Sequence, residues 1–114
     1  MSSLDQYVVV GKAVADPTRV RILTALSVRG LCVCELVDLM DLGQPAISRH
    51  LGILREAGLV DDIRDGKFVN YRLRRPARTA FAAAVVRGLI ESQGDDPDFE
   101  DLRERARVVD RFLL

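Results

Sequence analysis

Two cysteines separated by one residue, Cys32 and Cys34, are the side chains of this chain best suited to chemistry. Thiolates favour soft, thiophilic ions. Two sulfurs fall short of the four ligands that a structural zinc ion takes, whereas trivalent arsenic or antimony needs only two or three. The pair is therefore a candidate binding site for arsenite or antimonite. The same spacing also fits two small buried residues, or a thiol sensor that peroxide oxidises.

The spacing sets a geometric condition on this site. Residues two apart in a regular helix point about 200° apart around its axis, so their sulfurs cannot share one small ion. The sulfurs converge only if Cys32 lies outside the helix or if the first turn unwinds. Binding at both sulfurs would then distort or re-aim the helix. A helix N-terminus at this point is expected to lower the pKa of a cysteine and to favour the thiolate.

The chain around and after the cysteines has the spacing of two short helices joined by a turn. We predict the first helix over about 33–40, a turn over 41–43 that contains Gly43, and a second helix over 44–57. Such a pair is typical of a helix-turn-helix. If the apolar positions of the second helix face the core, the positions near its start can contact base edges and phosphates. These candidates for DNA contact are Gln44, Ser48, Arg49 and His50.

Two strand candidates follow, over 59–64 and 67–73, on either side of the hairpin signal Asp65-Gly66. A two-stranded hairpin directly after a recognition helix is the wing of a winged helix. Three of its side chains are candidates for contacts to the DNA backbone or minor groove: Arg64, Lys67 and Tyr71. Tyr71 fits equally well as a packed strand residue.

The net charge of the chain is zero, but the charge is unevenly divided. Residues 1–43 have a net charge of −1, residues 44–78 of +4 and residues 79–114 of −3. The positive charge is concentrated in the middle of the chain, where it can neutralise DNA phosphates. A solvated charged surface is the alternative.

A length of 114 residues with 48% hydrophobic residues allows one domain with a modest core. No segment is apolar for the length of a membrane span, and the first residues lack an export signal. We therefore expect a cytoplasmic protein whose cysteines are not a structural disulfide.

The predicted fold is mainly α (α+β): a winged helix-turn-helix with five to six helices and a two-stranded wing, assembled as a homodimer. Residues 1–91 are taken as the DNA-binding and dimerisation domain, and surplus apolar surface on its first and last helices is expected to form the dimer. The remaining predicted elements are a helix over 4–15, a helix that Asp16 caps and Gly30 ends, an apolar helix over 77–91, a linker over 92–98 and an amphipathic C-terminal helix over 99–114.

Over roughly residues 13–75 the chain resembles the ArsR/SmtB family of bacterial metal-responsive repressors. The matching segments are ADPTR at 15–19, IL at 22–23, LCVCEL at 31–36, QPAISRHL at 44–51, LREAGLV at 54–60, RDGK at 64–67 and YRL at 71–73. The resemblance implies a homodimeric winged helix that represses an operon until its ion arrives.

Within that family the cysteine motif is most similar to the arsenic-sensing branch. That branch often has a third cysteine three residues after the second, and Val37 stands there in this chain. The zinc-sensing branch places acidic and histidine ligands on a helix near the C-terminus. Residues 77–91 contain no histidine and only one acid, Glu91, so that zinc site is not expected.

These observations together predict a transcriptional repressor that binds near-palindromic double-stranded DNA and is released by arsenic(III) or antimony(III) at Cys32 and Cys34. No organic cofactor and no membrane partner are expected. A winged helix controlled by thiol oxidation, by another ligand or by a protein partner is the alternative. An enzyme is not expected, because neither a thioredoxin-like βαβ pattern nor a general base beside a nucleophile is present.

Overall fold

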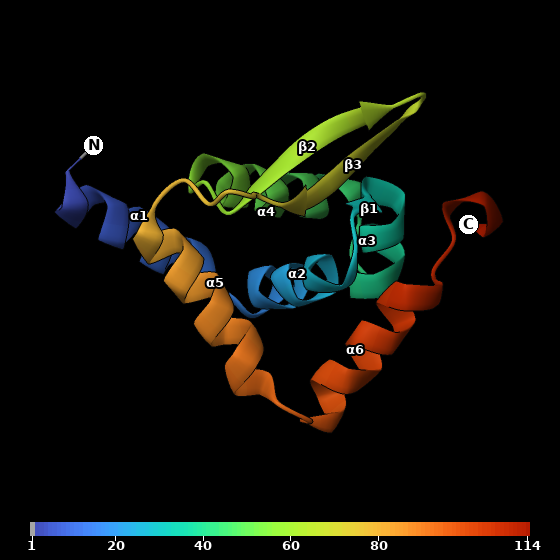
Figure 1. The fold of residues 1–114 in the computed structure, drawn as a ribbon. Helices are drawn as coiled ribbons and strands as arrows, with labels where there is room; N and C mark the ends of the chain where they lie inside the picture. The colour runs from blue at the N-terminus through green and yellow to red at the C-terminus, as the bar shows by residue number, and fades with distance from the viewer. Residues whose placement is uncertain (1) are drawn as a thin grey trace.

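The computed structural model describes residues 2–114 as a helical protein with a small antiparallel sheet. In Figure 1 the helix α2 crosses the centre, α4 and the sheet lie on one side of it, and α5 and α6 form a V on the other. The elements in chain order are α1 (Ser3–Val14), α2 (Pro17–Val28), β1 (Leu31–Cys32), α3 (Val33–Met40), α4 (Gln44–Glu56), β2 (Val60–Asp65), β3 (Phe68–Leu73), α5 (Ala80–Gln93), α6 (Pro97–Val108) and a 3-10 turn, η1 (Arg111–Leu113). The predicted winged helix-turn-helix is confirmed.

The central helix α2 begins and is buried as its sequence predicts. The side chain of Asp16 caps it by accepting a hydrogen bond from the amide of Arg19 at 3.1 Å, and Pro17 occupies the first turn. Five consecutive residues of α2, 22–26, are buried, because α1, α3, α4, α5 and α6 all pack around this helix. The helix-turn-helix pair α3 and α4 therefore rests on a continuous core.

The predicted two-stranded wing is present as the hairpin of β2 and β3, and a short third strand extends it to a sheet in the order β1-β3-β2. The third strand is the short segment Leu31–Cys32, which pairs antiparallel with the wing strand β3. In that register Cys32 lies opposite Asn70, and Leu31 lies opposite Tyr71. The first cysteine therefore belongs to the same sheet as the wing.

The hairpin turn lies one residue further along the chain than predicted. Asp65 is the last residue of β2 and pairs with Phe68, which leaves Gly66 and Lys67 as the two turn residues. Gly66 has a φ of 61°, a value that glycine adopts without the strain of a Cβ and that tight hairpin turns require. Lys67 is thereby placed at the tip of the wing.

The C-terminal part of the chain differs from its predicted boundaries and packs on the core. α5 continues to Gln93 and α6 begins at Pro97, so three residues, 94–96, connect two helices where a linker over 92–98 was expected. On α6, Leu102 and Ala106 are buried against α2. The last helix thus shares one core with the helix-turn-helix.

Apolar side chains remain exposed on α1, and α5 buries only one residue, Ala82. Leu4 is 70% exposed and Val8 46% exposed, while the ring of Tyr7 meets the ring of Phe81 on α5 edge to face at 4.8 Å. These two helices carry the surplus apolar surface that the sequence assigns to a dimer contact. No helix in residues 2–114 is long and apolar enough to cross a bilayer.

Candidate thiol site and nucleic-acid interface

Cys32 is the residue that caps α3, and Cys34 lies in the first turn of that helix. Cys32 has extended backbone angles, φ −81° and ψ 166°, and so lies outside the helix. Its amide donates a hydrogen bond to Glu35 Oε1 at 2.9 Å, and the amide of Glu35 reaches back to the Cys32 sulfur. This reciprocal capping box meets the geometric condition for the two sulfurs to converge.

Burial raises the pKa of the Cys32 thiol to about 12. Hydrogen bonding with the Cys34 thiol and the negative charge of Glu35 act in the same direction, whereas the hydrogen bond from the Glu35 amide opposes them. The expectation that the helix N-terminus lowers the thiol pKa is therefore wrong for Cys32. The residue is 1% exposed, and in that environment the charged thiolate loses more hydration than the helix end supplies.

The two cysteines open onto one hollow between α3 and the wing. Its walls are Cys32, Cys34 and Val37 from the helix side, Lys67, Phe68 and Val69 from the wing, and Leu114 from the C-terminal end. Cys34 is half-buried there. Within residues 2–114, no three side chains among His, Cys, Asp and Glu are grouped so that they could hold one metal ion. The site therefore offers two sulfurs.

Glu35 connects the thiol pair to the C-terminal helix through Arg29, a link that our sequence analysis missed. The Glu35 carboxylate is buried and accepts from Arg29 Nη2 at 3.1 Å. Arg29 Nε also donates to the carbonyl of Ala106 at 3.0 Å, and its Nη2 donates to the carbonyl of Val109. The capping-box spacing, an acid three residues after Cys32, was a usable signal for Glu35; Arg29 had no comparable local pattern.

The recognition helix α4 exposes three of its four predicted DNA-contact residues. Its apolar positions Ile47, Leu51 and Leu54 are fully buried, as expected. Gln44, Ser48 and Arg49 are exposed on the opposite side, and none of their side chains makes a hydrogen bond or ion pair within residues 2–114. These three side chains are free to meet a nucleic acid.

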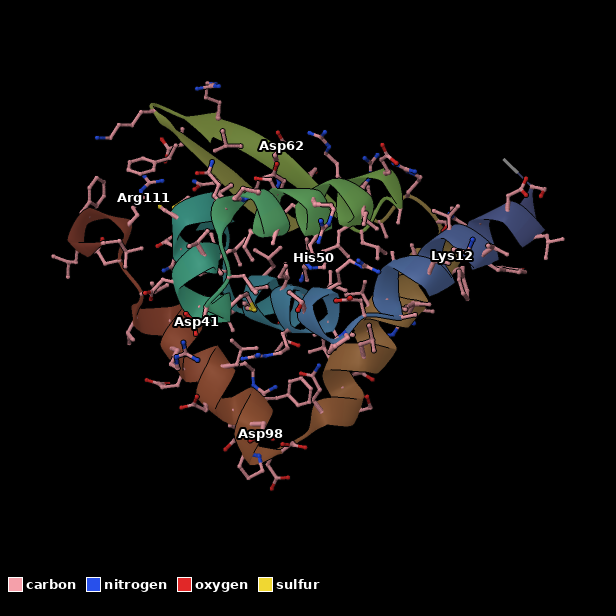
Figure 2. All side chains as sticks on the ribbon, turned by 180° about the vertical axis from the view of Figure 1, so that it is seen from behind. Lys12, Asp41, His50, Asp62, Asp98 and Arg111 are labelled. Carbon is pink, nitrogen blue, oxygen red and sulfur yellow. The ribbon has the colours of Figure 1, made fainter. Side chains whose placement is uncertain are left out.

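His50 points inward, so the prediction that it faces outward with Arg49 is wrong. It is 8% exposed, and its Nδ1 accepts a hydrogen bond from Arg19 Nη1 at 3.1 Å. Arg19 can only donate, so the proton of the neutral ring lies on Nε2. In Figure 2 His50 lies between α4 and the central helix α2. The signal was the spacing: position 50 is three residues after the buried Ile47 and shares its face.

The environment of His50 predicts a loss of stability in mild acid. Burial lowers the pKa of its imidazole, so the unfolded chain binds a proton near pH 6.5 that the folded ring binds only at lower pH. The free energy of unfolding should therefore decrease as the pH falls from about 7 to about 5.5, and urea denaturation would measure it. The free energy of unfolding of the variant His50→Asn should be about 1 kcal/mol lower at neutral pH, and it should change less with pH in this range. The same pH dependence of the unfolding free energy in wild type and His50→Asn would show that His50 is not the group responsible.

On the wing, Arg64 and Lys67 are exposed and have no carboxylate within ion-pair distance among the described residues. Lys67 lies 5.5 Å from the centre of the Phe68 ring. Tyr71 is half-buried and packs against the core, and burial raises the pKa of its hydroxyl. The wing therefore offers two free cations, and Tyr71 serves largely as a strand residue.

The known proteins that this chain resembles in sequence are transcriptional regulators of one kind. Residues 16–62 match the family described as bacterial regulatory protein, arsR family. The arsenic resistance transcriptional regulator ArsR1 of Pseudomonas putida is 41% identical over 99 residues, which cover 84% of this chain and 77% of that protein. The arsenical resistance operon repressor of Escherichia coli is 50% identical over 76 residues, 66% of this chain and 64% of that protein.

This chain belongs to the arsR family. Solved structures of similar proteins agree: HlyU from Vibrio cholerae has a TM-score of 0.68 at 32% identity and covers 81% of this chain and 97% of its own. A homodimeric winged helix-turn-helix DNA-binding domain from Mycobacterium bovis has a TM-score of 0.67 at 28% identity, over 82% of this chain and 84% of its own. As a member of the arsR family, the chain is a transcriptional regulator.

Proposed function

We propose that this arsR-family protein is a repressor that leaves its operator DNA when arsenic(III) or antimony(III) binds Cys32 and Cys34. The observation that carries the proposal is the position of Cys32, which caps α3, pairs with the wing strand and meets the Cys34 thiol. The names of two relatives, an arsenic resistance regulator and an arsenical resistance operon repressor, support the metalloid.

The chemistry of neutral arsenous acid suits a thiol with a raised pKa. In the reaction As(OH)3 + 2 RSH → (RS)2AsOH + 2 H2O, two As–S bonds replace two As–OH bonds, and each thiol proton leaves in water. No oxidation state changes, and no charge is created in the buried site. A divalent cation such as zinc requires deprotonated thiols, and oxidation by peroxide likewise requires a thiolate, whose sulfur attacks the peroxide oxygen. The raised pKa of Cys32 therefore favours a neutral metalloid hydroxide over either of these.

Binding at the sulfurs would act on the DNA-reading elements through direct contacts. Cys32 lies opposite Asn70 in the sheet, and its amide is held by Glu35. Drawing the Cys32 sulfur onto an ion shared with Cys34 would strain both the capping box and the β1–β3 pairing. Since α3 packs directly on α4, the recognition helix and the wing would both be displaced.

The proposed DNA contacts follow the exposed side chains. Gln44, Ser48 and Arg49 would meet bases and phosphates in the major groove, and Arg64 and Lys67 would meet phosphates beside it. Tyr71 would contribute only at the edge of this surface. We propose that His50 acts through its bond to Arg19, which fixes α4 on α2, and does not touch DNA.

A homodimer would bring two such surfaces onto one DNA. The exposed apolar side chains of α1 and the neighbouring α5 supply the contact, and the Mycobacterium bovis relative is a homodimer. A two-fold dimer reads half-sites about 34 Å apart, which predicts a near-palindromic operator.

The test is a binding measurement with a DNA duplex that the wild-type protein selects from a random-sequence library. Fluorescence anisotropy with and without arsenite should show an affinity about 100-fold lower at saturating arsenite, a coupling of typical size for allosteric proteins. Undiminished affinity at saturating arsenite would overturn the metalloid proposal, and failure to select any duplex would overturn the DNA proposal.

Arg49 should be the largest single contributor to the DNA affinity. The variant Arg49→Ala should bind the selected duplex about 10- to 100-fold more weakly, because a bidentate arginine contact to a base is worth about 1–3 kcal/mol. The matched control is Arg107→Ala: Arg107 is an exposed arginine of α6 that pairs with Glu104 and should not affect binding. Equal affinities for Arg49→Ala and wild type would favour a protein partner for this surface.

A further inference from the structure

The wing hairpin is electrically neutral by its own residues. Between Val60 and Leu73 it has three carboxylates and three cationic side chains. A neutral hairpin gains little from approaching DNA phosphates. The charge that the wing shows to a nucleic acid therefore depends on how its carboxylates are paired.

Each wing carboxylate is paired with an arginine, and two of these arginines come from outside the hairpin. Asp61 pairs with Arg72 of β3 at 2.7 Å. Asp62 pairs with Arg55 of the recognition helix at 3.2 Å. Asp65, next to the turn, pairs with a residue 46 positions away, Arg111, at 2.8 Å. These pairings leave Arg64 and Lys67 as the free charges of the wing.

Arg111 reaches the wing from the C-terminal strap, which we define as residues 109–114. Besides the Asp65 carboxylate, its guanidinium donates to Asn70 Oδ1 at 3.2 Å. It also lies 4.1 Å from the centre of the Phe68 ring, and that ring meets Phe112 edge to face at 5.7 Å. Figure 2 shows Arg111 between the C-terminal turn and the wing. With 19% of its side chain exposed, Arg111 is held by several contacts and not by one surface ion pair.

The other end of the strap is also fixed. Arg29 donates to the carbonyls of Ala106 and Val109, where α6 ends and the strap begins. Arg29 is itself paired with the buried carboxylate of Glu35. The strap is thus held at its base by the core and at its far end by the wing tip.

We propose that Arg111 is a positioning residue of the DNA interface: it neutralises Asp65 beside the wing tip so that Arg64 and Lys67 face phosphates unopposed. This inference rests on the proposed function. Without Arg111, a bare carboxylate would stand next to Arg64 and two residues from Lys67. It would repel the DNA backbone and attract the two cations that should contact it.

The test compares Arg111→Gln, Asp65→Asn and the double variant by anisotropy with the duplex selected by the wild type. Arg111→Gln should bind about five- to tenfold more weakly at low salt, and the difference should shrink as salt screens the exposed charges. Asp65→Asn should bind at least as well as the wild type. Since the double variant no longer has a carboxylate to neutralise, its affinity should return to within about twofold of Asp65→Asn.

The control is Arg107→Gln, which removes an exposed arginine whose ion pair, with Glu104, lies within α6. Its affinity should equal that of the wild type. Two results would overturn this role of Arg111: wild-type affinity in Arg111→Gln, or a double variant that binds the duplex as weakly as Arg111→Gln. If the wild type selected no duplex, the proposed function itself would fail. The failure of the Arg111 role and the failure of the proposed function therefore give different results.

Discussion

Replacing Cys32 with serine should abolish the roughly 100-fold effect of arsenite on DNA affinity and leave the affinity without arsenite within about threefold of wild type. Serine is a good helix-capping residue, so the start of α3 should persist. The hydroxyl cannot replace the thiol as a ligand for a soft ion. Cys34→Ser should behave in the same way, because one remaining sulfur cannot form a chelate. Anisotropy titrations with arsenite measure both variants.

The matched control lies between the two cysteines. Val33→Ala keeps both thiols, and its side chain is only partly buried, so its response to arsenite should remain. Isothermal titration should give one arsenite per thiol pair in wild type and Val33→Ala and none in the serine variants. Release of Cys32→Ser from DNA by arsenite would show that the ion acts elsewhere.

The parts of the fold that the sequence predicts well are those whose signals are local. The positions Ile47, Leu51 and Leu54 recur with helical spacing, and all three are buried. Asp16 and Pro17 mark the start of α2 by their types alone. The hairpin was found from its glycine, although the turn is shifted by one residue to Gly66 and Lys67.

The features that were missed depend on contacts between distant segments. β1 has two residues, both buried, so it shows no alternation from which a strand could be predicted. Arg111 and Asp65 are 46 residues apart, and no spacing rule connects them. The pKa of Cys32 was predicted in the wrong direction because the helix N-terminus is visible in the sequence, whereas the depth of burial is set by the packing of the wing.

Replacing Val37 with cysteine should tighten arsenite binding by about 100-fold, because a third sulfur in the same molecule acts at a high effective concentration. Val37 lines the hollow onto which both cysteines open, and it lies three residues after Cys34 on the same face of α3. The third thiol would displace the last hydroxyl: (RS)2AsOH + RSH → As(SR)3 + H2O.

Competition with a small dithiol would measure the arsenite affinity of Val37→Cys, and Val28→Cys is the matched control. Val28 is also a partly buried valine near a helix end, but it does not line the thiol hollow. Both substitutions nearly conserve volume and should cost less than about 1.5 kcal/mol of stability. If Val37→Cys bound arsenite no more tightly than Val28→Cys, an ion held at Cys32 and Cys34 could not lie within reach of position 37. The hollow between α3 and the wing would then not be the metalloid site, even if both cysteines proved necessary for release from DNA.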